Sequence, residues 1–458
     1  MLFPTGIFAA FFAVVFLLHW TFVATRPGLV RPFLLAANLA FYAFWSVEFC
    51  VALLAVGVWT WMIGLLAGAR RSRAWLWLGI AGTLAWLFWF KYTNFFLQEV
   101  VARLDWLGMG PTPLLDIVLP VGISFYCFQA ISYMVDAYEG EAEIERSPLN
   151  VLVYLTFFPH LAAGPIVRAA HFLPQLHTPP DRFRIPVTMA CILILGGLFK
   201  KMVVASELAT GIVDPVFRDP KAHGALDIWL AAYGYTIQIF CDFSAYSDMA
   251  IGFAALLGYH FPKNFDQPFR ALSLSEFWRR WHISLSTWLR DYVYIRCFGG
   301  NRRVVLALMG TMILGGIWHG GAWNFFAWGL LHGAALGVER ALGGKVAQGA
   351  KLLRWFITFH IVVFGFVLFR APDLATFAAM MQGLTDFATP SENASWRLPA
   401  LALLGLAFHF WPPDLRERLE RMLRPCPPAL LGVMAGLALL AILAAGPEGV
   451  APFIYFQF

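Results

Sequence analysis

The sequence predicts an all-α polytopic membrane protein. Of its 458 residues, 60% are hydrophobic and only 13% are charged, about half the charged fraction of an average soluble domain. The apolar residues also form long blocks, and residues 1–24 and 74–90 carry no charged side chain. Roughly 20 apolar residues can cross the hydrocarbon core as a helix, which satisfies its own backbone groups there. Together these observations exclude a soluble globular protein.

Apolar blocks along the whole chain are candidates for membrane spans. They lie near residues 6–25, 33–45, 49–68, 74–90, 118–137, 149–167, 186–205, 226–258, 304–323, 325–340, 352–369, 398–411 and 429–446. Several are too short to cross alone, and 226–258 is too long for one crossing. We therefore expect roughly 11 transmembrane helices plus re-entrant and interfacial helices. The first block lacks a preceding basic region and a clear cleavage site, which favours a retained helix over a signal peptide.

Charge and cysteine content give no support for a nucleic-acid-binding, disulfide-rich or metal-binding protein. The net charge of +6 is modest and sits in loops between the spans, where it reflects membrane topology and gives no reason to expect a nucleic-acid partner. Arg26, Arg31, Arg70, Arg71 and Arg73 place the N-terminus on the side opposite the cytoplasm. The six cysteines are scattered without a CxxC pair, so neither a disulfide framework nor a metal site is expected.

Residues 275–292 (SEFWRRWHISLSTWLRDY) are too polar to span but strongly patterned. At helical spacing, one face would carry Trp278, Trp281, His282, Leu285, Trp288, Leu289 and Tyr292. Arg279, Arg280 and Arg290 fall on the other faces. Aromatic and basic sides on one helix are typical of the membrane interface. We expect an interfacial helix on the cytoplasmic side, with His282 directed inward.

His319 is the strongest candidate for chemistry. It lies in GGIWHGGAWN (315–324), within an uncharged apolar block. The flanking glycines let another backbone or a ligand approach closely. A buried imidazole without a polar partner costs free energy, and ionisable residues inside a membrane suggest function by default. The alternative is a helix-packing glycine cluster with a bystander histidine.

A second polar cluster interrupts the apolar block 226–258. It reads CDFSAYSDMAIG (241–252) and includes Asp242, Ser247 and Asp248. Two carboxylates at that depth need partners or water, so we expect this helix to line a cavity. Equally, the two aspartates could cap a break in the helix or pair with arginines.

Taken together, these stretches resemble the membrane-bound O-acyltransferase family, especially its bacterial alginate O-acetylation branch. The matching stretches are LPVGISFYCFQAISYMVDAYEG (119–140), FFPHLAAGPIVR (157–168), CDFSAYSDMAIG (241–252), NFDQPFRALSLSEFWRRWHISLSTWLRDYVYI (264–295), GGNRR (299–303), GGIWHGGAWNFFAWGLLHG (315–333) and PFIYFQF (452–458). They follow the family order over nearly the whole chain.

The resemblance implies roles for particular residues. His319 matches the catalytic histidine of the family's tryptophan-His-Gly motif, and His282 matches the second signature position. Residues 1–458 would form one membrane-embedded O-acyltransferase domain with a catalytic core at about 118–340, built around a central funnel. Arg279, Arg280 and Arg290 would attract the phosphates of a coenzyme A donor, although anchoring to anionic lipid is an equal alternative for them. The further candidates for substrate contact are Trp281, Trp318, Asn324, Asp242, Ser247 and Asp248.

The resemblance also implies a reaction. An acetyl group would pass from a cytoplasmic thioester, expected to be acetyl-CoA, across the bacterial inner membrane to an exported polysaccharide, most simply alginate. Imidazole can take and return the alcohol proton near neutral pH. A separate periplasmic or anchored partner of the SGNH type would complete the transfer, and we expect no permanently bound cofactor and no metal. The alternatives are peptidoglycan or cellulose O-acetylation, D-alanyl transfer to teichoic acid, a lipid-linked glycan transporter, or a scaffold.

Overall fold

The computed structural model is helical throughout the part of the chain that it describes. It describes residues 1–99, 101, 114–162, 164–343, 350–391, 395–447 and 453–454, and every regular element in these ranges is a helix. The chain divides into two compact units. The first comprises residues 1–186 and 253–262, and the second comprises 187–252 and 263–458. The all-α prediction is confirmed.

Seven helical segments of the described chain are long and apolar enough to cross a membrane. They are Gly6–Val23, Val47–Arg70, Arg73–Lys91, Val187–Arg218, Ala225–Leu256, Lys351–Arg370 and Pro428–Ala445. Two shorter apolar helices, Val304–His319 and Arg397–Ala407, add to them. The chain is therefore a multi-pass membrane protein.

The first unit packs helices around α6. Its elements are α1 (Gly6–Leu18), η1 (His19–Val23), α2 (Pro27–Ala43), α3 (Val47–Arg70), α4 (Arg73–Lys91), α5 (Thr93–Glu99), α6 (Ile123–Glu139), α7 (Pro148–Thr156), α8 (Phe158–Leu161), α9 (Ala169–His177) and η3 (Arg182–Arg184). The block expected at 149–167 is not one helix. Asn38 of α2 accepts a hydrogen bond from the Phe158 backbone nitrogen at 3.1 Å and caps α8 separately.

The second unit holds all the candidate site residues. Its elements are α10 (Val187–Leu198), η4 (Phe199–Ala205), α11 (Ser206–Leu208), η5 (Ala209–Val213), α12 (Asp214–Arg218), η6 (Pro220–Ala222), most of α13 (Ala225–Leu256), η7 (Pro268–Arg270), α14 (Leu274–Arg280), α15 (Ile283–Trp288), η8 (Leu289–Ile295), η9 (Gly300–Arg303), α16 (Val304–His319), α17 (Trp323–Leu342), α19 (Lys351–Arg370), α20 (Leu374–Gly383), α21 (Arg397–Ala407), α22 (Leu415–Leu423) and α23 (Pro428–Ala445).

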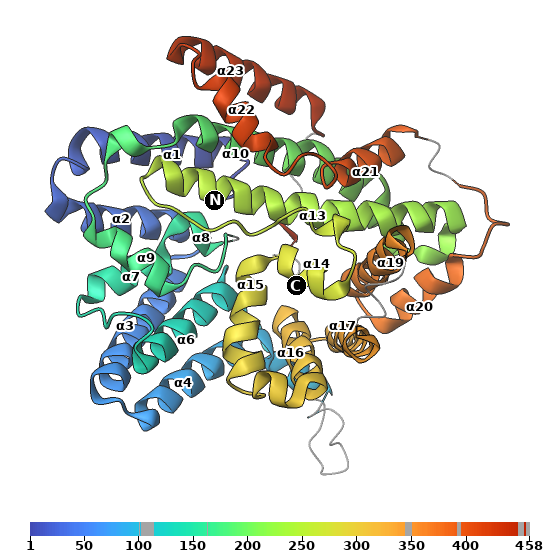
Figure 1. The fold of residues 1–458 in the computed structure, drawn as a ribbon, viewed down its shortest axis with the longest axis horizontal. Helices are drawn as coiled ribbons and strands as arrows, with labels where there is room; N and C mark the ends of the chain where they lie inside the picture. Colours follow the sequence, from blue (N-terminus) through green and yellow to red (C-terminus); the bar gives the residue numbers. More distant parts are fainter. Residues whose placement is uncertain are drawn as a thin grey trace. The chain divides into compact units, whose positions relative to one another are not determined.

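Helix α13 corrects one expectation from the sequence. It runs for 32 residues without a break (Figure 1), about 48 Å at the α-helical rise of ~1.5 Å per residue. Asp242 and Asp248 therefore do not cap a helix break. Both carboxylates are buried in the middle of a continuous helix, which is stable only because charged groups from other helices meet them.

The patterned segment 275–292 corrects another. It is not one helix: α14 ends at Arg280, and α15 begins at Ile283. His282 lies between them in the left-handed region, with φ 41°, where histidine occurs more readily than most residues. The predicted inward face survives the break, because Trp281, His282, Leu285 and Trp288 are all buried.

Candidate active site

His319 lies at the turn of a tight helical hairpin. It is the last residue of α16, and Gly320 after it is extended. Helices α16 and α17 lie side by side (Figure 1). A Cβ on Gly329 or Gly333 of α17 would collide with the α16 backbone near Met312 or Met309. The glycines therefore allow the close helix approach that the sequence suggested.

Aromatic rings surround the His319 side chain, which is only 6% exposed. The ring centroids of Trp318, Trp328 and Phe369 lie 4.8, 5.3 and 5.0 Å from the imidazole, each in an edge-on arrangement. Such walls exclude water and leave the imidazole few alternative orientations. A base held in this way is suited to a single, defined proton transfer.

His282 occupies a different aromatic pocket of the same unit. It is fully buried, and its imidazole lies 4.5 Å from the ring of Phe243 on α13 and 6.3 Å from that of Phe265. Asn264 holds the start of α15 behind it, because its side-chain oxygen accepts from the Ser284 nitrogen at 3.1 Å and the Ser284 hydroxyl at 2.8 Å. The ring neighbours of the two histidines come from different elements, so their paired action stays a prediction.

The helix before His282 is fixed at its start. Ser273 accepts from the Glu276 nitrogen, and Glu276 accepts from the Leu272 nitrogen, an arrangement close to a capping box at the start of α14. Glu339 of α17 accepts from the Leu274 nitrogen at 2.7 Å. These bonds attach α14 to the hairpin that carries His319.

The three candidate arginines have distinct surroundings. Arg280 is paired with Glu276 at 2.9 Å and Asp266 at 3.2 Å. Burial acts to raise the pKa of Asp266, but Lys263 and Arg280 outweigh it and lower that pKa. Arg279 is exposed. Arg290 is also exposed, and its hydrogen bond to Asp291 raises the pKa of its guanidinium.

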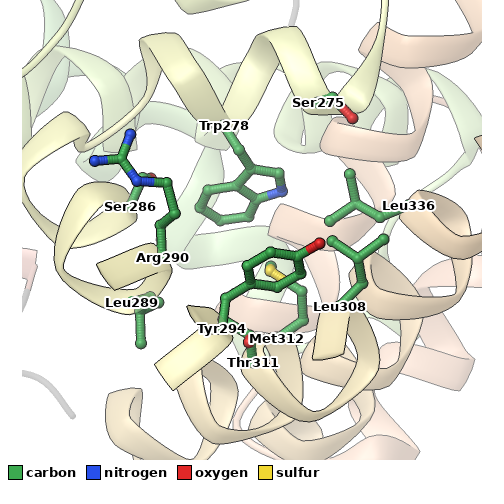
Figure 2. Close-up of a pocket in the computed structure, with 10 residues that line it drawn as sticks. All are labelled: Ser275, Trp278, Ser286, Leu289, Arg290, Tyr294, Leu308, Thr311, Met312 and Leu336. Atoms are coloured by element: carbon green, nitrogen blue, oxygen red, sulfur yellow. The ribbon is translucent and has the colours of Figure 1, made fainter. Parts of the chain in front are cut away.

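A cavity of about 210 Å³ lies between α14, α15, η8 and the α16–α17 hairpin. It is lined by Ser275, Trp278, Ser286, Leu289, Arg290, Tyr294, Leu308, Thr311, Met312 and Leu336, as Figure 2 shows. Trp278, which lines this cavity, packs against Trp328 at 5.6 Å between ring centroids, and Trp328 in turn contacts His319. Arg290 is thus the one candidate arginine among these lining residues.

The polar groups of α13 are held in ion pairs. Lys201 Nζ lies 2.9 Å from Asp242, and Lys200 Nζ lies 2.6 Å from Asp248. Arg416 of α22 contacts both oxygens of Asp248, at 3.0 and 2.6 Å. The sequence left open whether Asp242 and Asp248 pair with arginines. The structure pairs them with two lysines and one arginine.

Of the remaining candidates, Ser247 accepts a hydrogen bond from Asn264 at 3.0 Å. Asn324 donates to the Ala371 carbonyl at 2.8 Å. Trp281 is 4% exposed and packs between Phe265, Phe277 and Phe366. Trp318 is likewise 4% exposed. Direct contact of these side chains with substrate stays a prediction.

Sequence reasoning missed several residues of this region. Lys200 and Lys201 carry two charges in the apolar block 186–205, and charged residues inside a span are a signal that could have identified them. Trp278 was expected only on the inward face of 275–292, and Trp328 appeared only within a motif. The motif at 452–458 lies mostly outside the described residues, but Ile454 donates its backbone nitrogen to Asp242 at 3.0 Å. Among the described residues, no group of three or more His, Cys, Asp or Glu side chains is arranged to hold a metal ion.

The fold and site define a multi-pass helical membrane protein with a buried histidine at a hairpin turn. A family model described as the membrane-bound O-acyltransferase family matches residues 144–380. The chain is 36% identical to a probable alginate O-acetylase, AlgI, of Pseudomonas putida, over the full length of both chains.

Other relatives are named for different activities. A peptidoglycan O-acetyltransferase of Helicobacter pylori is 34% identical, over 84% of this chain and 80% of its own. A teichoic acid D-alanyltransferase of Bacillus subtilis is 30% identical, over 54% of this chain and 68% of its own. The chain belongs to the membrane-bound O-acyltransferase family, and it is an acyltransferase.

Proposed function

We propose that the protein is a membrane-bound O-acetyltransferase that passes acetyl groups from a cytoplasmic thioester, acetyl-CoA, to an exported polysaccharide, with alginate as the leading acceptor. The observation that carries this proposal is the His319 imidazole, buried within aromatic walls at the turn of α16 and α17. The full-length similarity to a probable alginate O-acetylase supports both the acetyl group and the polysaccharide.

In the proposed chemistry His319 acts as the base. It takes the proton from an attacking hydroxyl while the hydroxyl oxygen forms a bond to the thioester carbonyl carbon. The carbon–sulfur bond then breaks, and the imidazolium returns its proton to the thiolate, so that no net proton is consumed. His282 would assist by orienting the donor or polarising its carbonyl.

The cavity beside Arg290 supports a site for the donor. Coenzyme A carries phosphates, and an exposed guanidinium at a partly apolar cavity can pair with a phosphate while the thioester arm enters. Trp278 and Trp328 stand between this cavity and His319. The donor would therefore approach His319 along these rings. Asp242, Ser247 and Asp248 are buried and paired, so in this proposal they would support the wall of the funnel from behind.

The acceptor is reached on the far side of the bacterial inner membrane. The donor is made in the cytoplasm and the glycan is exported, so the acetyl group must cross about 30 Å of hydrocarbon. Moving the charged coenzyme itself would be costly, because each phosphate would need a partner. A funnel that narrows at His319 avoids that transfer and leaves an SGNH-type partner protein to place the acetyl group on the sugar. Peptidoglycan is the second candidate acceptor, because the Helicobacter pylori relative also aligns over most of both chains.

The test is His319→Ala in cells that lack their own copy of the protein. We expect the O-acetyl content of the exported polysaccharide to fall to background while the amount of protein in the membrane stays near normal. His360→Ala is the control, because His360 belongs to the same unit but hydrogen-bonds to Tyr233 at 2.9 Å, away from the hairpin turn. Normal acetylation by a well-expressed His319→Ala protein would contradict the assignment.

A second measurement separates transfer from transport. Purified protein is incubated with acetyl-CoA carrying a labelled acetyl group, and the release of free thiol is followed. Thiol release that depends on His319 supports the acetyl donor. Movement of a lipid-linked glycan without thiol release would refute it.

A further inference from the structure

His332 is a buried histidine that the proposed chemistry does not use. It lies on α17 and is only 1% exposed. Neither of its ring nitrogens has a hydrogen-bond partner among the residues that the structure describes. An unpaired buried polar group is unfavourable, so an apolar ring would fill this position at a lower cost in free energy. Burial alone therefore does not favour an imidazole here.

One residue, Trp328, contacts both His332 and His319. The His332 ring lies 4.6 Å from Trp328, one turn earlier on the same face of α17. Trp328 lies 5.3 Å from His319. One indole therefore separates the two histidines. The Trp278 ring contacts both His332 and Trp328, with its centroid 5.3 Å from that of His332 and 5.6 Å from that of Trp328.

The facing helix limits where the His332 ring can lie. A Cβ added to Gly365 of α19 would sit 2.6 Å from the His332 Nε2 atom, which is closer than real Cβ contacts allow. The backbone of α19 thus approaches the imidazole where only glycine fits. A larger ring at 332, or a methyl group at 365, has to move Trp328 or Trp278.

The orientation of His319 depends on these walls. Because α16 ends at His319 and Gly320 is extended, no further turn of α16 follows it. The rings of Trp318, Trp328 and Phe369 contact its imidazole. We propose that His332 is a positioning residue for acyl transfer, which holds the Trp328 indole at the angle that orients His319. This inference rests on the proposed function of His319.

Two substitutions test the inference in the full-length protein, with thiol release from acetyl-CoA as the assay. Gly365→Ala pushes the His332 ring without changing its chemistry. His332→Phe removes the ring nitrogens and enlarges the ring. For each we expect kcat to fall about tenfold or more, because small misplacements of a catalytic group are costly. The KM for acetyl-CoA should stay within about twofold, since neither substituted position lines the cavity and Arg290, the proposed phosphate partner, is untouched.

Gly405→Ala is the matched control. Gly405 is a helical glycine of α21 in the same unit, and a Cβ there would overlap the Ile237 side chain of α13. This variant is strained in a comparable way but does not touch the rings next to His319, so its kcat should stay normal. Equal losses of kcat in Gly405→Ala and Gly365→Ala would overturn the inference, as would a change in KM alone.

The same assay separates failure of the inference from failure of the proposed function. Loss of activity in His319→Ala, with normal kcat in both Gly365→Ala and His332→Phe, would overturn only the role of His332. Full activity in His319→Ala would overturn the proposed function itself. In that case the positions of Trp328 and His332 would have no catalytic meaning.

Discussion

Two buried polar regions of the second unit are built in opposite ways. Around His319 the neighbours are aromatic rings, and a cavity lies behind the next ring. Around Asp242 and Asp248 the neighbours are charged groups, and each carboxylate is neutralised by lysine or arginine. Buried polarity therefore has two meanings in this membrane protein. Paired charges fix helices together, whereas the imidazole within aromatic walls is the proposed base.

Breaking one ion pair should have the largest effect of all on folding. Lys201→Met leaves Asp242 with a buried charge, because the two side chains are only 1% and 3% exposed. Removing one partner of a buried pair typically costs about 3–5 kcal/mol. We expect loss of folded protein, measured by size-exclusion chromatography of the detergent extract. Replacing both partners, with Lys201→Met and Asp242→Leu, should restore much of the yield.

The assignment of the Asp242–Lys201 pair to the scaffold is wrong if Lys201→Met folds normally and loses only acetyl transfer. That outcome would place Asp242 and Lys201 in the reaction rather than in the scaffold.

His282→Ala should reduce activity more than it reduces folding. A positioned acid–base or polarising group contributes on the order of 10²–10⁴-fold, so we expect transfer to fall by at least about 10²-fold. The protein should still be recovered, although removing a fully buried ring next to Phe243 will lower its thermal stability. Acetyl transfer is measured per folded molecule. Retention of more than half of the activity would remove His282 from the site.

Arg290→Ala should act on donor binding. We expect the KM for acetyl-CoA to rise several-fold with little change in kcat, because an exposed ion pair with phosphate is worth only about 1 kcal/mol. The effect should shrink as salt is added. Arg303→Ala is the control, since Arg303 is equally exposed but does not line the cavity. An identical response from both variants would favour general attraction to anionic lipid.

The smallest effect concerns a loop of the first unit. Burial acts to raise the pKa of Glu145, but hydrogen bonds from Asn150, Ser147 and His177 outweigh it and lower that pKa. The ionised carboxylate therefore stabilises the fold above the unfolded-state pKa, and this contribution is lost as pH falls through the folded-state pKa. Glu145→Gln should lower stability at neutral pH by about 1 kcal/mol and weaken its acid dependence. Melting in detergent between pH 7 and pH 4 measures both, and parallel curves would contradict the assignment.

The sequence predicts local features of this fold better than distant ones. The apolar blocks at 49–68, 74–90, 352–369 and 429–446 appear as helices close to their expected limits. The break at His282 was missed, because Asn264 and not a neighbouring residue caps α15. The inward face was still largely right, since Trp281, His282, Leu285 and Trp288 on either side of the break are buried, while Trp278 is partly exposed.

The candidate site shows the same limit. His319 could be found from its own motif, because glycines and an imidazole in an apolar block are unusual within a few residues. The partners of Asp242 and Asp248 could not, since Lys200, Lys201 and Arg416 lie more than 40 positions away in the chain. The contact between His332 and Trp328 could be read as helical spacing, but its link to His319 required the hairpin geometry.

The glycine-packed hairpin has a mechanical consequence. With α16 and α17 in backbone contact at Gly329 and Gly333, neither leg can slide along the other without a steric clash. We therefore expect the hairpin to move as one rigid lever, with His319 at its tip. The two-residue link at Trp281 and His282, which separates α14 from α15, is buried and is held by Asn264. We therefore expect any motion that admits a donor to displace whole helices, while the hairpin carries His319 with it unchanged.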